Sequence, residues 1–336
     1  MGATVQRKGN GRTGCWIALG ALGMIFLAGI MLIGVSAMIV RNAKREVAFG
    51  SGERPVDQAP TFKETWSYGY GDAKVVRIPL QGVIMRGRRE RLLGYAPDMV
   101  EKVLAQIRCA TLDEEAEAIL LEIDSPGGAV TPSDEIYEAL LRFKATDTNR
   151  YVFVFVRDLC ASGAYYASMA GDYVMAEPTA LVGSVGVIME TMNLKGLGDK
   201  LGLKTVTIAS GANKDMLNPF KEINSNQVAM IQAIVDETQN RFASIVMQAR
   251  GLENRDLLDG RILTARQAKR EGFVDAIGYW DDMLDVVREV LDVEDVYVVR
   301  YEKKRGFLEE LMEAKTPHLP SLNVRSGPRL MSIWNP

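Results

Sequence analysis

Three segments of the chain combine residue types and positions that suit catalysis. In the first, DSPGGA (124–129) lies directly after a predicted buried strand and before a predicted helix. Adjacent glycines let the backbone approach a ligand closely, and their N–H groups can converge on an anion. The turn could therefore be an oxyanion hole, or simply a tight connection between strand and helix.

The second segment, ASGAYY (161–166), places Ser162 at the end of another predicted strand that opens into a helix. A serine at such a position exposes its Oγ above the sheet edge, and the amide N–H groups that follow point toward the same space. The simpler interpretation is helix capping, which is the usual role of a serine before a helix. Taken alone, the segment leaves both roles open.

The third segment is the polar loop SGANKDMLNP (210–219), after the predicted strand LKTVTIA (203–209). Lys214 in this loop would ordinarily be a solvated surface lysine. To act as a general base it must lose its proton near pH 7–8 rather than at about 10.4. A change of roughly three pH units needs about 4 kcal/mol of desolvation or of hydrogen bonding to the neutral amine.

The histidine content limits the choice of base. The chain has one histidine, His318, in the Pro-containing stretch TPHLPS (316–321), which is typical of a loop or tail. A Ser-His-Asp or Cys-His enzyme needs an imidazole held against its nucleophile by a packed scaffold, and His-based zinc chemistry needs more histidines. If the chain performs nucleophilic catalysis, its base is therefore expected to be a lysine or a carboxylate.

Composition excludes several other classes of protein. The 40 Lys and Arg are balanced by 43 Asp and Glu, so no nucleic-acid partner is indicated. Cys15, Cys109 and Cys160 match no metal spacing; buried thiols are favoured, with one disulfide between the last two as the alternative. Because no P-loop or Rossmann fingerprint occurs, neither a metal nor another cofactor is expected.

The N-terminal part of the chain predicts a membrane anchor. Residues 1–14 are polar and basic, and residues 15–40 contain no charge, so this run exceeds the roughly 20 residues that cross a bilayer core. A cleaved signal peptide would have a shorter apolar region of about 7–15 residues. Basic residues flank the run on both sides, so charge does not fix its orientation. Residues 41–72 are rich in Gly, Pro and polar residues and are expected to form a stalk.

Residues 73–303 show the alternation of strands and helices that indicates an α/β domain with right-handed crossovers. The expected strands are 73–85, 118–124, 151–156 and 173–177, and the expected helices are 97–110, 131–143, 161–170, 225–250 and 264–272. Thr131 is expected to cap its helix, with Pro132 at the first helical position. The longest helix carries one apolar face, formed by Val228, Ile231, Val235, Phe242 and Ile245.

The C-terminal extension, 304–336, is ambiguous. Its apolar segment PRLMSIW could form a final strand on the domain or remain a tail, and it could approach the chain's own active site.

Six segments together resemble the signal peptide peptidase A family, in its short single-repeat bacterial form. They occur in the family's order and span about residues 73–300: IPLQGVI, LEIDSPGG, CASGAYYAS, LVGSVGVI, SGANKDML and GRILTARQAKREGFVDAIG. The resemblance implies the ClpP/crotonase-like α/β fold, a spiral of β-β-α units, preceded here by an N-terminal transmembrane helix.

The resemblance also implies roles for single residues. Ser162 matches the family's nucleophile and Lys214 its general base, while the backbone amides of Gly128 and Gly163 match its oxyanion hole. Ser184 matches a hydroxyl that orients the lysine amine. The sequence departs from the family pattern at Ala164, where a second glycine is common, a change of one methyl group.

The function that the resemblance implies is that of a membrane-anchored serine endopeptidase with a Ser-Lys dyad, degrading signal peptide remnants and other short apolar peptides. A homo-oligomeric ring, expected to be an octamer, is also implied. The expected location is the bacterial inner membrane, with a single span and the catalytic domain on the periplasmic or extracellular side. Three alternatives remain: a ClpP-class serine protease with a dedicated protein substrate, an inactive membrane scaffold, and a CoA-dependent crotonase-type enzyme.

Overall fold

The computed structural model describes residue 60, residues 62–302 except 88, 92, 93 and 97, and residues 331–333. The predicted anchor (15–40) and the basic segment before it lie outside the described residues. Among the helices of the described part, none is both long and apolar enough to cross a membrane.

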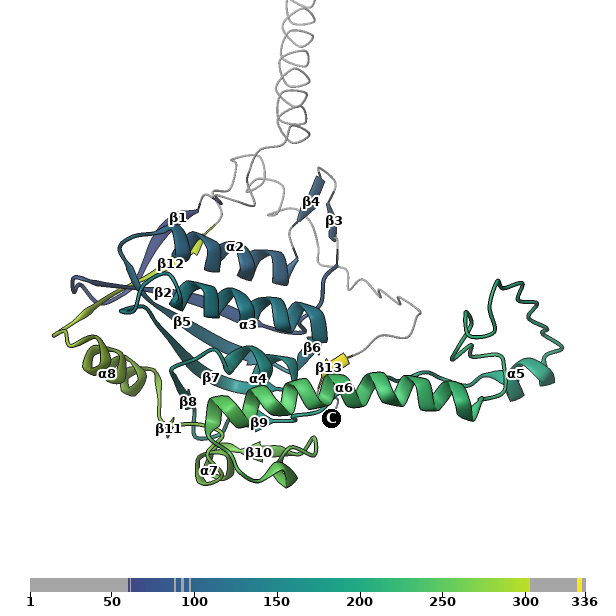
Figure 1. The fold of residues 1–336 in the computed structure, drawn as a ribbon. Coiled ribbons are helices and arrows are strands. Elements are labelled where there is room, and N and C mark those ends of the chain that lie inside the picture. The colour runs from purple at the N-terminus through teal and green to yellow at the C-terminus, as the bar shows by residue number, and fades with distance from the viewer. Residues whose placement is uncertain are drawn as a thin grey trace, which may run out of the picture. The chain divides into compact units, whose positions relative to one another are not determined.

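The domain is built on one nine-stranded sheet, in the order β1-β12-β2-β5-β7-β8-β11, with β9 paired to β7 and β10 paired to β9 (Figure 1). The strands of this sheet are β1 Lys63–Tyr68, β2 Ala73–Gln81, β5 Ala116–Ser125, β7 Tyr151–Ala161, β8 Tyr173–Ala176, β9 Leu181–Gly183, β10 Ile262–Thr264, β11 Ala276–Ile277 and β12 Val296–Glu302. Strands β12, β2, β5, β7, β8 and β11 run parallel, whereas β1 and β10 are antiparallel to their neighbours. The predicted α/β architecture is therefore confirmed.

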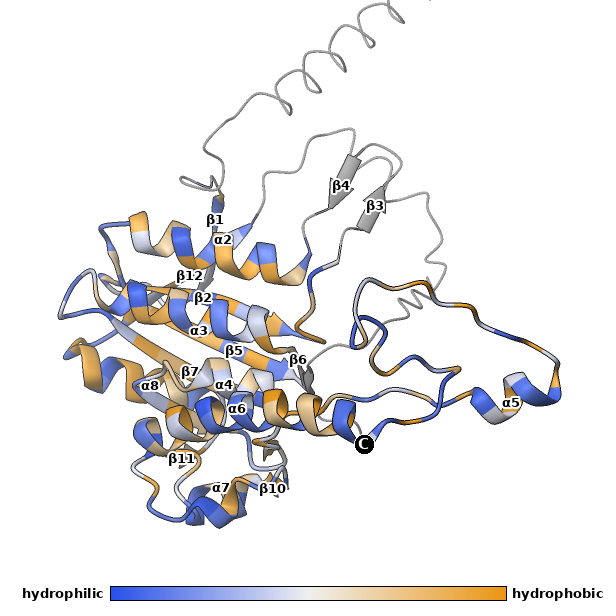
Figure 2. Ribbon diagram, turned by 45° about the vertical axis from the view of Figure 1, so that its right-hand side comes forward, coloured by the Kyte–Doolittle hydropathy of each residue, from blue (hydrophilic) through white to orange (hydrophobic). Residues whose placement is uncertain are grey.

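Helices cover both faces of this sheet, which explains why its central strands are apolar throughout. In β5, Ile119, Leu121 and Ile123 face one apolar core, while Ala118 and Leu120 face the other. The helices α2 Met99–Leu112, α3 Val130–Lys144 and α4 Gly163–Ser168 cover the first face, and α8 Trp280–Leu291 covers part of the second. Figure 2 shows the apolar strands enclosed between these helices. A further short helix, α7 Ala265–Arg270, follows β10, and a short 3-10 helix spans Arg255–Leu257.

Two predicted boundaries were wrong. Helix α3 begins at Val130, with Ala129 as its N-cap and no side-chain cap, so Thr131 and Pro132 lie inside its first turn. The proline is tolerated there because first-turn N–H groups have no partner within the helix. The folded domain also begins before Ala73, since β1, within the expected stalk, pairs antiparallel with β12.

An arm extends from the body of the domain. It consists of α5 Lys195–Lys200, the loop that follows, and the N-terminal part of α6 Ser225–Arg250 (Figure 1). The strand expected at 203–209 is absent from the described structure of this loop, and Val206 and Ile208 are 87% and 98% exposed. An apolar extended segment becomes a strand only when another strand accepts its hydrogen bonds, and no strand among the described residues pairs with this one.

Helix α6 has the predicted bounds, but its apolar face is buried only toward its C-terminal end. Phe242, Ala243 and Val246 are buried, whereas Val228 and Ile234 are more than two-fifths exposed. The helix therefore packs on the body with one half and projects its other half into the arm.

The C-terminal segment forms a strand. β13 Met331–Ile333 pairs antiparallel with β6 Gly127–Ala129, with Ser332 opposite Gly128. Of the two alternatives for this segment, the final strand is confirmed. The remaining two strands, β3 Arg89–Arg91 and β4 Gly94–Ala96, form a separate antiparallel hairpin.

Candidate active site

The parallel pairing of β5 and β7 brings the first two catalytic segments together. Ser125 at the end of β5 lies opposite Cys160 near the end of β7. Two residues further along the chain lie Gly127, the first residue of β6, and Ser162, which follows the end of β7, and α4 contacts β6. The glycine pair and the serine, 35 positions apart in sequence, therefore lie side by side at the carboxyl edge of the sheet.

The backbone of Ser162 shows that this serine is not an ordinary helix cap. It occupies the N-cap position of α4, yet its φ and ψ are 55° and −119°, and its side chain makes no capping hydrogen bond. Non-glycine residues with positive φ cost about 1–3 kcal/mol and cluster at functional sites. A serine held in a sharp turn between strand and helix is the arrangement that presents a nucleophile above a sheet.

The surroundings of Ser162 fix its position. Its N–H donates to the Gly183 carbonyl at 2.8 Å, and its Oγ lies 3.4 Å from the Gly186 carbonyl, to which it donates. Between these two residues lies Ser184, which also has positive φ (51°) and donates its N–H to the Arg261 carbonyl at 2.7 Å. The structure therefore brings Ser184 beside Ser162.

Gly128 lies where only a glycine fits. A Cβ at this position would lie 2.0 Å from the Ile84 carbonyl oxygen. The close approach follows from two hydrogen bonds that tie Ile84 to the glycine turn, from Ile84 N–H to the Gly127 carbonyl (2.8 Å) and from Ala129 N–H to the Ile84 carbonyl (2.7 Å). Gly163 begins α4, where the helix itself provides no acceptor for the amide N–H. Both predicted oxyanion residues thus lie near the serine.

Two ionisable groups near the site have raised pKa values, the Cys160 thiol and the Asp124 carboxyl. Burial raises the pKa of Cys160 to about 12, so this thiol, two residues before Ser162, is protonated at neutral pH. At the base of the glycine turn, burial and then repulsion by Asp158 raise the pKa of Asp124. Cys109 and Cys160 are free thiols, without the disulfide that was the alternative; Cys160 is buried as expected, whereas Cys109 is only partly buried.

Lys214 is not brought to Ser162 within one chain. Its loop is attached to the N-terminal end of α6, where the Gln227 amide donates to the Ala212 carbonyl at 3.2 Å. Twelve residues later on the same helix, Gln239 donates to the Val185 carbonyl at 3.3 Å, next to the residue that Ser162 contacts. Twelve residues of α-helix span about 18 Å, which is much longer than a lysine side chain. Lys214 itself is exposed.

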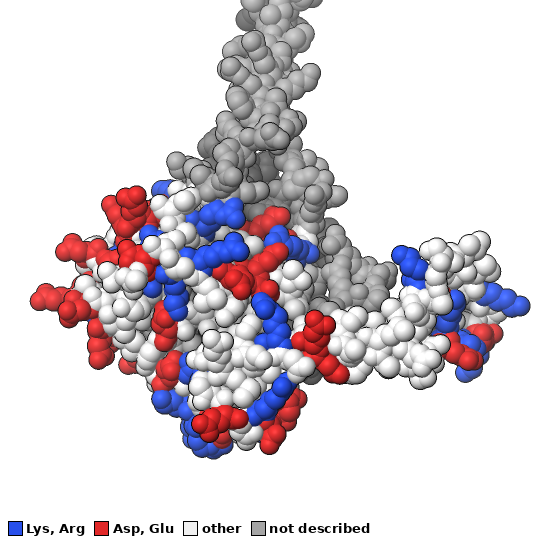
Figure 3. All heavy atoms as spheres, in the orientation of Figure 1, with Lys and Arg blue, Asp and Glu red and all other residues white. Residues whose placement is uncertain are grey.

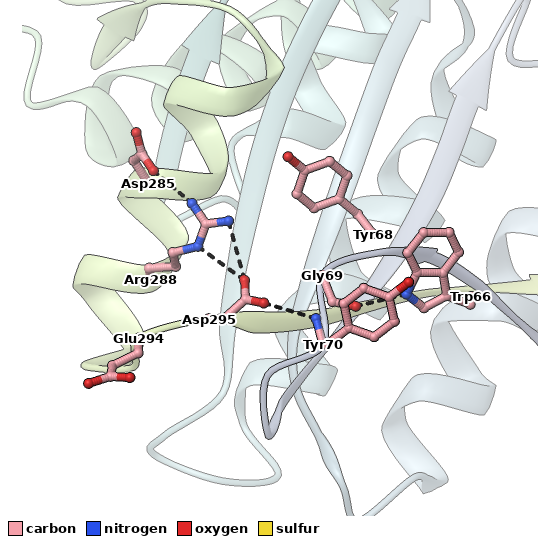
Figure 4. Close-up of a pocket in the computed structure, with 8 residues that line it drawn as sticks. All are labelled: Trp66, Tyr68, Gly69, Tyr70, Asp285, Arg288, Glu294 and Asp295. Atoms are coloured by element: carbon pink, nitrogen blue, oxygen red, sulfur yellow. Dashed lines mark hydrogen bonds and ion pairs between the residues drawn. The ribbon is translucent and has the colours of Figure 1, made fainter.

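One pocket of the described structure lies elsewhere. It has a volume of about 710 Å³ and lies between the turn after β1 and the segment from α8 to β12; its lining includes Trp66, Tyr70 and Asp295 (Figure 4). The Tyr70 amide donates to Asp295, which also pairs with Arg288. These residues precede β2 and β12 at the amino edge of the parallel strands, whereas Ser162 follows β7 at the carboxyl edge. This pocket is therefore separate from the candidate active site.

Three residues that the sequence did not single out, namely Asp134, Tyr166 and Arg241, form one hydrogen-bonded cluster on the helices next to the site. Tyr166 stands one helical turn after Ser162, and that spacing was the only available signal. The other two come from helices whose contacts depend on tertiary packing.

Comparison with known proteins agrees with this geometry. Residues 144–294 match the model of peptidase family S49, and residues 94–182 match the model of Clp protease. A putative signal peptide peptidase SppA of Enterococcus faecium is 28% identical, over 95% of this chain and 93% of that protein. A putative protease of Synechocystis is 33% identical, over 62% of this chain and 71% of that protein. Protease 4 of Salmonella typhi is 26% identical, over 63% of this chain and 34% of that protein. These matches establish the family, and the strained serine beside a glycine turn at the carboxyl edge of the sheet agrees with them. The chain belongs to peptidase family S49 and is a serine peptidase.

Proposed function

We propose that the protein is a membrane-anchored endopeptidase with a Ser-Lys dyad that degrades signal peptide remnants and other short apolar peptides. The observation that carries this proposal is the backbone of Ser162, held at positive φ, without a capping bond, beside the glycine turn. A capping role would need neither the strained conformation nor the neighbouring amides.

The proposed reaction is acyl transfer. Ser162 Oγ attacks the scissile carbonyl carbon and gives its proton to the neutral amine of Lys214. The Gly128 and Gly163 N–H groups donate hydrogen bonds to the oxyanion that forms, each worth about 3–4 kcal/mol in systems of this kind. The lysine then protonates the leaving amine as the C–N bond breaks. Water attacks the acyl-enzyme by the same proton transfers, which releases the acid and restores Ser162.

The position of Lys214 favours a site completed by a second protomer. The lysine must be neutral to accept a proton, and burial is the usual physical cause of neutrality. Since Lys214 is exposed and far along α6 from Ser162 in one chain, a neighbouring protomer is the natural source of that burial. We infer that the Lys214 loop of one protomer docks at the Ser162 of the next.

The surface of the arm supports such assembly. It exposes several large apolar side chains, namely Leu201, Leu203, Val206, Ile208, Ile223 and Met230. Between its tip and the body, the face of the arm seen in Figure 3 carries few charges. Exposed apolar surface of this extent is typical of protein interfaces. Head-to-tail contacts of this kind close into a ring when the rotation permits, and the expected octamer is one such ring.

The proposed membrane attachment is based on the uncharged segment 15–40, which is long enough to cross a bilayer. The proposed orientation places the N-terminus in the cytoplasm and the peptidase domain outside. Protease treatment of intact spheroplasts should degrade residues 47–336. Protection of that part until the membrane is lysed would overturn the orientation.

The dyad is tested with the full-length protein in detergent and a panel of fluorogenic apolar peptides. Ser162→Ala and Lys214→Ala should each abolish turnover, because one removes the nucleophile and the other the base. Lys204→Ala is the matched control, since Lys204 is an exposed lysine of the same loop, and it should keep wild-type activity. Wild-type turnover by Lys214→Ala would require another base. A wild-type enzyme that cleaves no member of the panel would favour a dedicated protein substrate.

A further inference from the structure

Three polar side chains from three different helices meet at Tyr166, one helical turn after the nucleophile. The Tyr166 hydroxyl, on α4, donates to Asp134 Oδ1 on α3 at 2.5 Å. Arg241, on α6, donates through Nε to the Tyr166 oxygen at 3.1 Å and through Nη2 to Asp134 Oδ1 at 2.6 Å. Each member of this cluster thus contacts the other two.

Each of these elements carries or adjoins one part of the candidate site. Tyr166 belongs to the first turn of α4, and its N–H donates to the Ser162 carbonyl at 2.8 Å. Asp134 stands on α3, which directly follows the glycine turn in β6. Arg241 stands on α6, whose Gln239 holds the Val185 carbonyl beside the serine and whose N-terminal end holds the Lys214 loop.

The surroundings of the Tyr166 hydroxyl make its hydrogen bonds strong and directional. Tyr166 is 4% exposed and packs against Tyr137 and Phe242, with ring centroids 5.4 and 5.0 Å away. Its two partners, Asp134 and Arg241, are charged and partly exposed, and hydrogen bonds to charged partners are stronger than those between neutral groups. Burial, followed by the hydrogen bond to Asp134, raises the pKa of Tyr166, so the hydroxyl keeps its proton and donates it to the carboxylate.

We propose that Tyr166 is a positioning residue of the peptidase. Through Asp134 and Arg241, its hydroxyl holds the nucleophile turn, the oxyanion turn and α6 at fixed distances from one another. Holding these elements rigidly matters for catalysis, because small displacements of the reacting groups lower the rate by large factors. The inference rests on the proposed function only in taking Ser162 as the nucleophile.

The direct test is Tyr166→Phe in the full-length enzyme, with Tyr137→Phe as the matched control. Both changes remove one phenol hydroxyl from the same aromatic cluster, but within the described residues the Tyr137 hydroxyl has no hydrogen-bond partner. Tyr166→Phe should lower kcat about tenfold with KM changed less than about twofold, because geometry around the nucleophile is lost while peptide binding is kept. Tyr137→Phe should leave both constants unchanged.

A second pair of variants separates positioning from mere stability. The Arg241 side chain is 55% exposed, so its replacement leaves the core intact. Arg241→Gln should lower kcat, and Arg241→Lys should restore part of the loss by keeping a cation beside Asp134. The double variant Tyr166→Phe/Arg241→Gln should be no slower than the worse single variant, since both act through one cluster.

Three results would overturn the inference: wild-type kcat for Tyr166→Phe, an equal loss for Tyr137→Phe, or losses that multiply in the double variant. These outcomes are distinct from failure of the proposed function, which would appear as activity retained by Ser162→Ala. If Ser162→Ala is inactive while Tyr166→Phe is normal, only the positioning role is lost.

Discussion

The backbone at Ser162 and Gly128 has features that few residue types tolerate, a positive φ at the serine and a close contact with another backbone segment at the glycine. Ser162 holds a positive φ that costs about 1–3 kcal/mol, and packing of the surrounding turn must offset that cost. Gly128 admits the Ile84 carbonyl into the space that any other side chain would fill. At this scale the site consists of backbone geometry as much as of side chains.

Gly128→Ala is expected to lower kcat/KM by about 100-fold or more, because the new methyl group would push the turn away from Ile84 and misplace one oxyanion donor. Steady-state peptide hydrolysis measures the loss, and circular dichroism reports whether the fold is kept. Gly87→Ala is the matched control, since a Cβ there meets no atom within 4 Å and the residue has no positive φ. Normal activity of the Gly128 variant would remove this glycine from the oxyanion hole.

At the scale of elements, the position of β13 has a consequence for substrate binding. The strand pairs with β6, which contains the glycine turn, and it also contacts α4. Extended peptides bind proteins by adding a strand to an exposed edge, and in this structure β13 occupies the edge of β6.

Truncation of the chain before Thr316 is therefore expected to increase kcat/KM for short peptides by about two- to tenfold, by exposing that edge. The measurement is hydrolysis at low substrate concentration, with size-exclusion chromatography as the check on assembly. An unchanged rate in a protein that still assembles would show that β13 does not compete with substrate.

A second element-scale contact attaches the end of α6 to the sheet. Arg250 donates two hydrogen bonds to Asp275, at 2.9 and 2.7 Å, and the Val174 N–H donates a third at 2.8 Å. The side chains of Arg250 and Asp275 are only 9% and 31% exposed. Burial alone would raise the pKa of Asp275, but these hydrogen bonds outweigh it and hold that pKa below its ordinary value of 3.8.

Asp275→Asn is expected to lower the free energy of unfolding at neutral pH by about 3 kcal/mol, because a buried guanidinium loses its counter-charge. Since the folded-state pKa is depressed, the ionised carboxylate stabilises the fold above its unfolded pKa. That stabilisation is lost as the pH falls through the folded value. The difference between wild type and variant should therefore shrink below about pH 4, as measured by chemical denaturation over a pH series.

The control for this pair is Glu271→Gln, which removes a pair with the largely exposed Arg270 and should change stability by less than about 1 kcal/mol. A difference between wild type and Asp275→Asn that stays constant down to pH 3 would contradict the ionic explanation.

At the scale of the whole molecule, the arm separates the two members of the proposed dyad. A chain that contains both Ser162 and Lys214 but cannot bring them together is expected to be inactive as a monomer. Its activity should then depend on assembly, and its exposed apolar arm provides a surface for assembly.

Co-expression of Ser162→Ala chains with Lys214→Ala chains should restore turnover to about a quarter of the wild-type level, because random mixing in a ring pairs an intact serine with an intact neighbouring lysine at that frequency. Each variant alone should be inactive. Rings that contain both variants and remain inactive would indicate that the dyad forms within one chain.

Several elements of this fold could be predicted from the sequence alone. The apolar runs of β5 and β7 and the full length of α6 were predictable, because local periodicity and burial on both faces leave a direct mark in sequence. The positions of Ser162 and Gly128 at strand ends were predictable for the same reason. That the two residues lie close together could be predicted only from the family resemblance, because the number of residues between two strands does not reveal whether the strands are neighbours in the sheet.

Tertiary structure alone decided the rest. Whether Ser162 caps a helix depends on its backbone angles, which one residue type does not fix. The segment 203–209 has the composition of a strand, but no strand of the described part of the chain pairs with it, and it is exposed. The cluster of Tyr166, Asp134 and Arg241 joins residues far apart in sequence, and only the packing of three helices brings them together. Sequence determined the residue types and local elements because these depend on near neighbours, whereas the site depends on contacts between elements that only the folded chain brings together.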